Sequence, residues 1–253
     1  MRLPDARNRA VQEEFERVAE LFSRRSAGRF DELGAVEFAR TNPGERVIEL
    51  GGGTGNFISA FAEVTDDLTI VDLTEGMLRV ARRHHPGMKL VVGDAARLPL
   101  RSGSIDLATS AQAFHHIFEP VPVVMEMRRV VGKDGRVLIV DQVTSEKYEE
   151  IEALMELELL RDPSHAASRP PSALRLIVRA GGLEIVDEKI QVDEQRFSSW
   201  MWPVEFPQQR IDAVRSWIER WGHKTGMDFR REGDDWAFTR RRMMILAERP
   251  ASG

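Results

Sequence analysis

The stretch that decides the fold reads Glu49-Leu50-Gly51-Gly52-Gly53-Thr54-Gly55. An apolar segment expected to be a buried strand, residues 46–50, leads into it, and residues 56–64 are apolar enough for a helix. Glycines allow the backbone to turn tightly, and the backbone N–H groups at the start of a helix can approach a ligand. The stretch therefore predicts a strand, a ligand-binding glycine loop and a helix.

The spacing of the glycines narrows the class of ligand. The dinucleotide-binding pattern G-x-G-x-x-G requires glycine or alanine at position 56, where this chain has Asn56. A phosphate loop ends in Gly-Lys followed by Ser or Thr, and that ending is absent. What remains is an acidic residue followed by G-x-G-x-G.

Strands and helices alternate on both sides of this loop. Strands are expected at 46–50, 68–72, 89–92, 105–110, 136–143, 183–192 and 243–248, and helices at 5–30, 56–64, 74–84, 122–131, 146–160 and 174–180. We expect Thr74 to cap its helix and Arg240-Arg241-Arg242 to form a solvated turn before the last strand. Alternation at this spacing indicates an α/β protein with a mostly parallel sheet.

The glycine loop and several later segments resemble, in the same order, the motifs of class I S-adenosylmethionine-dependent methyltransferases of the small-molecule type, similar to the bacterial quinone and natural-product enzymes. The later segments are Ile70-Val71-Asp72-Leu73, Thr74-Glu75-Gly76-Met77-Leu78, Gly93-Asp94-Ala95-Ala96-Arg97-Leu98-Pro99, residues 105–116 and residues 128–135. The resemblance implies a Rossmann-like, doubly wound α/β fold. Its mostly parallel sheet would have seven strands, with an N-terminal helical lead-in and a helical cap insertion.

The resemblance also implies one methyltransferase domain over 1–253, with N-terminal helices at 1–44, a cofactor-binding core at 45–145 and an acceptor side at 146–253. The cofactor would be S-adenosyl-L-methionine, and the product S-adenosyl-L-homocysteine. Asp72 would accept both ribose hydroxyls, Met77 would lie on the adenine face, and Asp94 would accept from the adenine amino group. The implied cofactor-binding residues are Glu49, Gly51, Gly52, Gly53, Gly55, Asp72, Leu73, Met77, Asp94, Ala95 and Ser110.

Three histidines are the candidate catalytic residues. A sulfonium is already an activated methyl donor, so alignment of the two reactants can supply on the order of 7–11 kcal/mol of the barrier. His115 and His116 follow the expected fourth strand, where ligands bind in open α/β sheets. A neutral imidazole there can accept a proton near neutral pH, or it can bond the backbone and shape the pocket. His165 is the third candidate, in a proline-rich loop of the acceptor side.

The acceptor is expected to contact Gln112, Asp162 and Ser164. The alternative for Asp162 and Ser164 is that they cap a turn. The methylated atom, whether carbon, oxygen or nitrogen, is not encoded in these motifs. A metal held by the three histidines is conceivable, but nothing in the spacing demands it, and we expect no metal.

Composition excludes several classes of partner. The formal net charge of -5 argues against nucleic acid, and no apolar run is long enough to span a membrane. The chain has no cysteine, which is compatible with a reducing cytoplasm, the expected location. We therefore expect a small-molecule acceptor, and a homodimer is left open. All five tryptophans lie in residues 195–242, which could cap an apolar acceptor, form a dimer surface or be plain core.

The same residues bear on competing functions. A base-modifying methyltransferase would need an Asn/Asp-Pro-Pro-aromatic run where residues 110–113 read Ser-Ala-Gln-Ala, and an aminopropyl transferase would need acids there. A quinone acceptor is left open, although the N-terminal signature of the quinone enzymes is absent. The alternative from another class is a non-catalytic module that binds S-adenosylmethionine or NAD.

Overall fold

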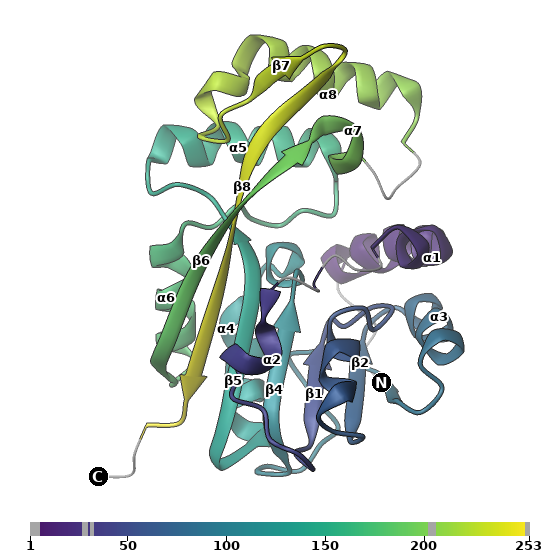
Figure 1. Cartoon of the computed structure of the whole chain (residues 1–253), viewed down its shortest axis with the longest axis vertical. Coiled ribbons are helices and arrows are strands. Elements are labelled where there is room, and N and C mark those ends of the chain that lie inside the picture. Colours follow the sequence, from purple (N-terminus) through teal and green to yellow (C-terminus); the bar gives the residue numbers. More distant parts are fainter. Residues whose placement is uncertain (1–5, 27–29, 31–32, 202–205, 251–253) are drawn as a thin grey trace.

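The protein is described from a computed structural model, which covers residues 6–26, 30, 33–201 and 206–250 (Figure 1). Its sheet has the strand order β3-β2-β1-β4-β5-β8-β6, and a short eighth strand, β7, pairs with β8. The bounds are β1 Val47–Leu50, β2 Leu68–Asp72, β3 Lys89–Val92, β4 Ile105–Ala111, β5 Val131–Val143, β6 Glu184–Arg196, β7 Arg230–Glu232 and β8 Asp235–Glu248. The first five strands are parallel, while β8 is antiparallel to both β5 and β6. All seven expected strands are present in this mostly parallel sheet, and the eighth strand, β7, was not expected.

Helices cover both faces of this sheet, as the doubly wound fold requires. One face packs against α4 (Pro120–Val130) and α6 (Pro171–Ala180), through a core that includes Met127 and Val178. The other face packs against α2 (Ala35–Phe38), the 3-10 helix η2 (Ile58–Glu63) and α3 (Glu75–His84). The strand order reverses between β1 and β4, so the ligand-binding crevice is expected at the carboxyl ends of these strands.

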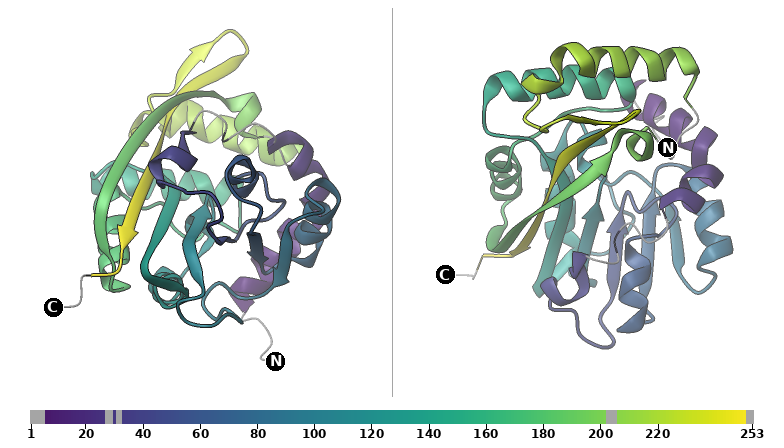
Figure 2. Two further views of the ribbon diagram at one scale, coloured as in Figure 1. Left: turned by 60° about the horizontal axis from the view of Figure 1, so that its bottom comes forward. Right: turned by 45° about the horizontal axis from the view of Figure 1, so that its top comes forward.

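A cap stands over the carboxyl edge of the sheet (Figure 2). It consists of α5 (Tyr148–Arg161), α7 (Phe197–Trp200), α8 (Gln208–Trp221), the 3-10 helix η4 (Gly222–Lys224) and the far ends of β6, β7 and β8. The cap has its own hydrophobic core, in which Leu157, Trp200 and Phe238 are buried. For Trp200 the plain-core interpretation is therefore confirmed, whereas Trp202 lies outside the described residues.

The N-terminal helix α1 (Ala6–Ser26) lies beside α3 at the same edge of the sheet (Figure 1). Its Phe15 and Phe22 pack edge to face and join Met77 of α3 in a small apolar cluster. The expected helical lead-in is thus confirmed, and it closes the carboxyl edge next to the glycine loop.

Two local predictions were wrong, whereas the helix expected after the glycine loop is present as a short 3-10 helix. Thr74 precedes α3, but its side chain makes no cap hydrogen bond, and its backbone N–H donates to Asp72 Oδ1 at 2.8 Å. Arg240-Arg241-Arg242 lie inside β8, since β6 and β8 form one long antiparallel ladder that carries Arg240 opposite Asp193. The arginine triplet is therefore part of the cap and not a solvated turn.

Candidate cofactor site and histidine cluster

The glycine loop is shaped by close packing on one side and open space on the other. Gly51, Gly53 and Gly55 have φ values of 67°, 54° and 84°, a region that disfavours other residues. A Cβ at Gly51 would lie 2.7 Å from the Cβ of Ala113, so the loop is pressed against the segment after β4. At Gly53 the nearest atom would be Met77 Sδ, at 4.0 Å. The loop is therefore open at Gly53, and we call this open side the cradle.

Asp72, at the end of β2, holds the loop from the side. Its Oδ2 accepts from Gly53 N at 2.8 Å, and its Oδ1 accepts from Thr74 N at 2.8 Å. Burial raises the pKa of Asp72 above its ordinary value, although these backbone donors oppose the rise. Each carboxylate oxygen has two lone pairs, so the group retains acceptor capacity toward a ribose. The contact of Asp72 with a ribose stays a prediction.

Glu49 is buried beneath the glycine loop. The sequence analysis predicts that its carboxylate faces the ligand. It is 1% exposed, and its Oε2 accepts from Ile58 N at 3.1 Å. A Cβ at Gly52 would come within 3.0 Å of Oε2, so Gly52 provides the room for this carboxyl group. Burial raises the pKa of Glu49 well above its ordinary value. The structure thus gives Glu49 a clear part in holding the loop, and its contact with the cofactor stays a prediction.

The remaining cofactor candidates line the same edge or support it. The Leu73 carbonyl accepts from Gln12 Nε2 of α1 at 2.9 Å, and Met77 is only 2% exposed beneath α1. Asp94 Oδ1 accepts from Ala96 N at 2.9 Å, which places the partly buried Ala95 at the tip of a turn after β3. Ser110 Oγ donates to the Leu50 carbonyl at 2.8 Å, a bond that ties β4 to β1 behind the loop.

His115 follows β4, Asp141 lies near the carboxyl end of β5, and the two form a buried pair. His115 Nδ1 lies 2.6 Å from Asp141 Oδ1, and the His115 backbone N–H donates to Asp141 Oδ2 at 2.7 Å. Burial lowers the pKa of His115 well below its ordinary value and raises the pKa of Asp141 to about 6. At neutral pH the imidazole is therefore neutral, with Nδ1–H donating to the carboxylate and Nε2 left as an acceptor. The sequence analysis missed Asp141, although an acid at the carboxyl end of a central strand was the available signal.

His116 is fixed by the loop that contains the sequence Asp162-Pro163-Ser164-His165. Its Nδ1 lies 3.1 Å from both the carbonyl oxygen and the Oγ of Ser164. Ser164 in turn donates from Oγ and from its backbone N–H to Asp162 Oδ1, at 2.6 and 2.9 Å. Asp162 and Ser164 therefore cap a turn, as one alternative predicted, and the same bonds also orient His116. Phe15 of α1 packs edge to face on the His116 ring at 5.1 Å.

His165 completes the cluster from below. It is 1% exposed, its Nε2 is 3.0 Å from Ser168 Oγ, and its Nδ1 has no partner among the described residues. The His115 ring lies 4.2 Å from that of His116 and 5.6 Å from that of His165, between centroids. Burial lowers the pKa of His165 to about 4, so this ring is also neutral at pH 7. The structure thus brings together the three histidines that the sequence singled out.

Gln112 directly follows β4 and precedes Ala113, which lies against Gly51 of the glycine loop. It has a φ of 53°, and its N–H donates to the Val140 carbonyl at 2.7 Å.

Across the described part of the chain, no group of three or more His, Cys, Asp or Glu side chains could hold a metal ion. The same residues include no helix with the length and apolar character needed to cross a membrane.

Known proteins resemble this chain in parts of the sequence. Residues 48–139 match the family described as Methyltransferase domain. The chain is 28% identical over 192 residues to a Bacillus subtilis (strain 168) protein named uncharacterized methyltransferase YcgJ, covering 74% of this chain and 69% of that one. It is 35% identical over 124 residues to the demethylmenaquinone methyltransferase of Beutenbergia cavernae, covering 49% of each. The chain thus spans about half the length of the second relative.

Two solved structures share the fold. The YcgJ protein from Bacillus subtilis aligns with a TM-score of 0.75 at 23% identity, covering 85% of this chain and 97% of that chain. The phosphoethanolamine N-methyltransferase 2 of Haemonchus contortus, solved in complex with S-adenosyl-L-methionine, aligns with a TM-score of 0.65 at 16% identity, covering 98% and 60%.

Proposed function

The chain belongs to the S-adenosylmethionine-dependent methyltransferases, and from that membership we propose that it methylates a small molecule at the carboxyl edge of its sheet. The observation that carries this proposal is the glycine cradle. Gly53 faces open space next to the partly buried Asp72, while Gly51 and Gly55 allow the close packing that shapes the loop. No other segment of the described chain combines such a loop with an acid at the tip of the neighbouring strand.

In this proposal the cofactor lies across β1, β2 and β3. The loop N–H groups would receive the carboxylate of the methionine end, Asp72 would accept from the ribose, and Asp94 with Ala95 would bind the adenine. When bound, S-adenosylmethionine supplies a methyl group activated by the sulfonium. Helix α1 would exclude water above Met77, since the two already pack together.

The acceptor side of the proposal is the histidine cluster under the cap. His115 would act as the base where the acceptor must lose a proton, because Asp141 holds the neutral ring with Nδ1–H inward and leaves Nε2 to accept. His116, Gln112, Asp162 and Ser164 would position the acceptor. Their fixed rotamers favour alignment, which is the main requirement when the donor is already activated.

A small acceptor is favoured over a macromolecule. The cap stands over the carboxyl edge of the sheet and α1 closes it next to the glycine loop (Figure 1), and the net charge of -5 disfavours nucleic acid. Demethylmenaquinone is the substrate in the name of one relative, but the similarity to that protein covers only 49% of each chain. The proposal therefore commits to the class of reaction and not to a quinone.

Isothermal titration with S-adenosylhomocysteine and with NADH tests the proposal. We expect saturable binding of one S-adenosylhomocysteine per chain and no comparable binding of NADH. Tight NADH binding without S-adenosylhomocysteine binding would replace the proposal with the NAD-module alternative. Saturable binding without methyl transfer to any member of a broad small-molecule panel would replace it with a binding-only module.

A further inference from the structure

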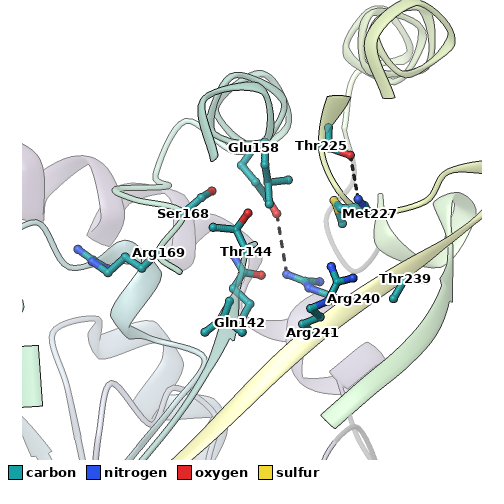
Figure 3. Close-up of a pocket in the computed structure, with 12 residues that line it drawn as sticks. Gln142, Thr144, Glu158, Ser168, Arg169, Thr225, Met227, Thr239, Arg240 and Arg241 are labelled. Atoms are coloured by element: carbon teal, nitrogen blue, oxygen red, sulfur yellow. Dashed lines mark hydrogen bonds and ion pairs between the residues drawn. The ribbon is translucent and has the colours of Figure 1, made fainter. Parts of the chain in front are cut away.

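A small cavity lies where β5 and β8 leave the sheet and meet α5 of the cap (Figure 3). Its volume is about 20 Å³, which is room for one water molecule or one oxygen atom of a ligand. Gln142 and Thr144 line it from the end of β5, Glu158 from α5 and Arg240 from β8. The histidine cluster adjoins it, because the lining residue Ser168 bonds His165 at 3.0 Å.

Arg240 brings a buried positive charge with a weak partner into this cavity. Its side chain is 10% exposed, and Nη2 lies 4.0 Å from Glu158 Oε1. The Glu158 carboxylate is already engaged, since its Oε2 accepts from Arg161 Nη2 at 2.8 Å and Nε at 2.9 Å. Burial lowers the pKa of Arg240 to about 10, so the guanidinium stays charged at neutral pH. Within the described residues this guanidinium donates no hydrogen bond.

Thr144 adds an unused polar group to the same cavity. It is 4% exposed, and its Oγ1 has no hydrogen-bond partner among the described residues. The Oε1 of Gln142 is likewise buried without a partner in the described part of the chain. Buried polar groups are normally hydrogen-bonded, so several unpaired ones around one cavity indicate an occupant with polar atoms.

The charged residues of the lining indicate the sign of that occupant. The lining contains a single acid, Glu158, and three arginines, Arg169, Arg240 and Arg241. Arg169 and Arg241 donate to backbone carbonyls, of Phe114 at 2.6 Å and of Gly226 at 2.8 Å, and these carbonyls bring no formal charge. The lining therefore carries more positive than negative formal charge, and a guanidinium and a hydroxyl on one cavity can both donate to a carboxylate.

The position of the cavity fits an acceptor of limited size. The glycine loop follows β1, the histidines follow β4 and the cavity lies at the end of β5, on three adjacent strands. Because neighbouring strands are about 4.8 Å apart, the cavity lies roughly 10 Å along the edge from a ligand in front of β1. One small molecule can span that distance, with its reacting atom near the histidines.

We propose that Arg240 and Thr144 form an anion subsite that binds the carboxylate of a small acidic methyl acceptor. This inference rests on the function proposed above and narrows it to one substrate class. One carboxylate oxygen would occupy the cavity, accept from the Arg240 guanidinium and the Thr144 hydroxyl, and take the place of water.

Titration with benzoate and with benzamide tests the subsite, because the two share a ring and differ in charge. The purified full chain is titrated by calorimetry, with and without S-adenosylhomocysteine, at ionic strength held constant with sodium chloride. We expect benzoate to bind saturably and benzamide to bind at least tenfold more weakly. Arg240→Gln should weaken benzoate binding at least tenfold, and Thr144→Val several-fold.

Arg230→Gln is the matched control. Arg230 lies on β7 of the same cap, its side chain is 50% exposed, and it forms an ion pair with Glu194 of β6. This variant should leave benzoate binding unchanged. Circular dichroism and S-adenosylhomocysteine affinity report whether each variant folds. If Arg240→Gln does not fold, the benzoate affinity of Thr144→Val tests the subsite. Absence of saturable benzoate binding, or equal binding of benzamide, overturns the subsite. Failure of the wild-type chain to bind S-adenosylhomocysteine would instead overturn the proposed function.

Discussion

Asp141 accepts two hydrogen bonds from His115, one from the ring Nδ1 at 2.6 Å and one from the backbone N–H at 2.7 Å. The pair joins the ends of β4 and β5, and neither residue exceeds 7% exposure. A histidine held in this way has a defined tautomer and a fixed ring plane, which a positioned base requires.

Asp141→Asn should lower turnover by roughly 10²-fold, the lower end of what a positioned base contributes. The wild-type rate should fall as the pH drops below about 6, because Asp141, whose pKa burial raises to about 6, is then protonated and loses its carboxylate. Turnover measured from pH 5 to 9 checks both effects. Asp134→Asn is the control, because Asp134 is exposed near the opposite end of β5. Equal turnover of the Asp141→Asn and Asp134→Asn variants would remove the His115–Asp141 pair from the mechanism.

Gly53→Val should abolish binding of S-adenosylhomocysteine, because the new side chain fills the open side of the loop. Gly44→Val is a matched control, since Gly44 also has a positive φ, of 79°, and a Cβ added there would meet no atom within 4 Å. Both variants carry similar backbone strain, but only Gly53 lies in the cradle. Calorimetric affinities that fall equally in the two variants would show that strain, and not the site, causes the loss.

Asp72→Ala should weaken S-adenosylhomocysteine binding by about 1–3 kcal/mol, from lost hydrogen bonds to a charged acceptor. The change also frees the N–H groups of Gly53 and Thr74, which loosens the loop. Asp67→Ala, at the other end of β2, removes an exposed pair with Lys89 and should leave the affinity unchanged. Equal affinities for wild type and Asp72→Ala would move the ribose away from β2.

His165→Ala should lower turnover more than it lowers S-adenosylhomocysteine affinity. The ring lies among the acceptor-side groups, 5.6 Å from the His115 ring, and away from the glycine loop. Comparing kcat with the calorimetric affinity separates the two effects. His223→Ala, on the exposed surface of the cap, serves as the control, and an unaltered rate for His165→Ala would take this residue out of the site.

Glu158→Gln should lower the free energy of unfolding by about 3–5 kcal/mol at pH 7, because Arg161 and Arg240 then lose their shared carboxylate inside the cap. Burial opposes ionisation of Glu158, but Arg161 and its neighbours outweigh it and lower the pKa from 4.5 to about 2. The ionised group therefore stabilises the fold above pH 4.5, and this contribution is lost as the pH falls toward 2. Glu156→Gln, at an exposed position of the same helix, is the control. Urea unfolding should show a lower free energy of unfolding for Glu158→Gln than for Glu156→Gln at pH 7, and this difference should shrink below pH 4.5.

The strands and the loop around Gly51–Gly55 could be predicted from the sequence because their signals are local. Glycine spacing after Val47–Leu50 and an acid at the end of Leu68–Asp72 report backbone geometry within a few residues. The cap was harder, because β6 and β8 pair over a long ladder between segments distant in sequence. Arg240 looks like a solvated residue until that ladder places it against Glu158.

The same reason explains the partial success at the histidine cluster. The paired histidines after β4 were found by their position on the sheet, and His165 by its loop. Asp141 was missed because its role depends on contact with His115, 26 residues away along the chain. Likewise, turn capping by Asp162 and Ser164 was one of the two alternatives that the sequence left open, but their hold on His116 required the tertiary structure.

A crystal structure of the chain with S-adenosylhomocysteine measures most directly whether the cradle is the cofactor site. We expect the methionine end against the Gly51–Gly55 backbone, the ribose hydroxyls on Asp72 and the sulfur turned toward His115 and His116. Clear density for the nucleoside at any other place, or a cradle that stays empty at saturating ligand, would contradict this assignment.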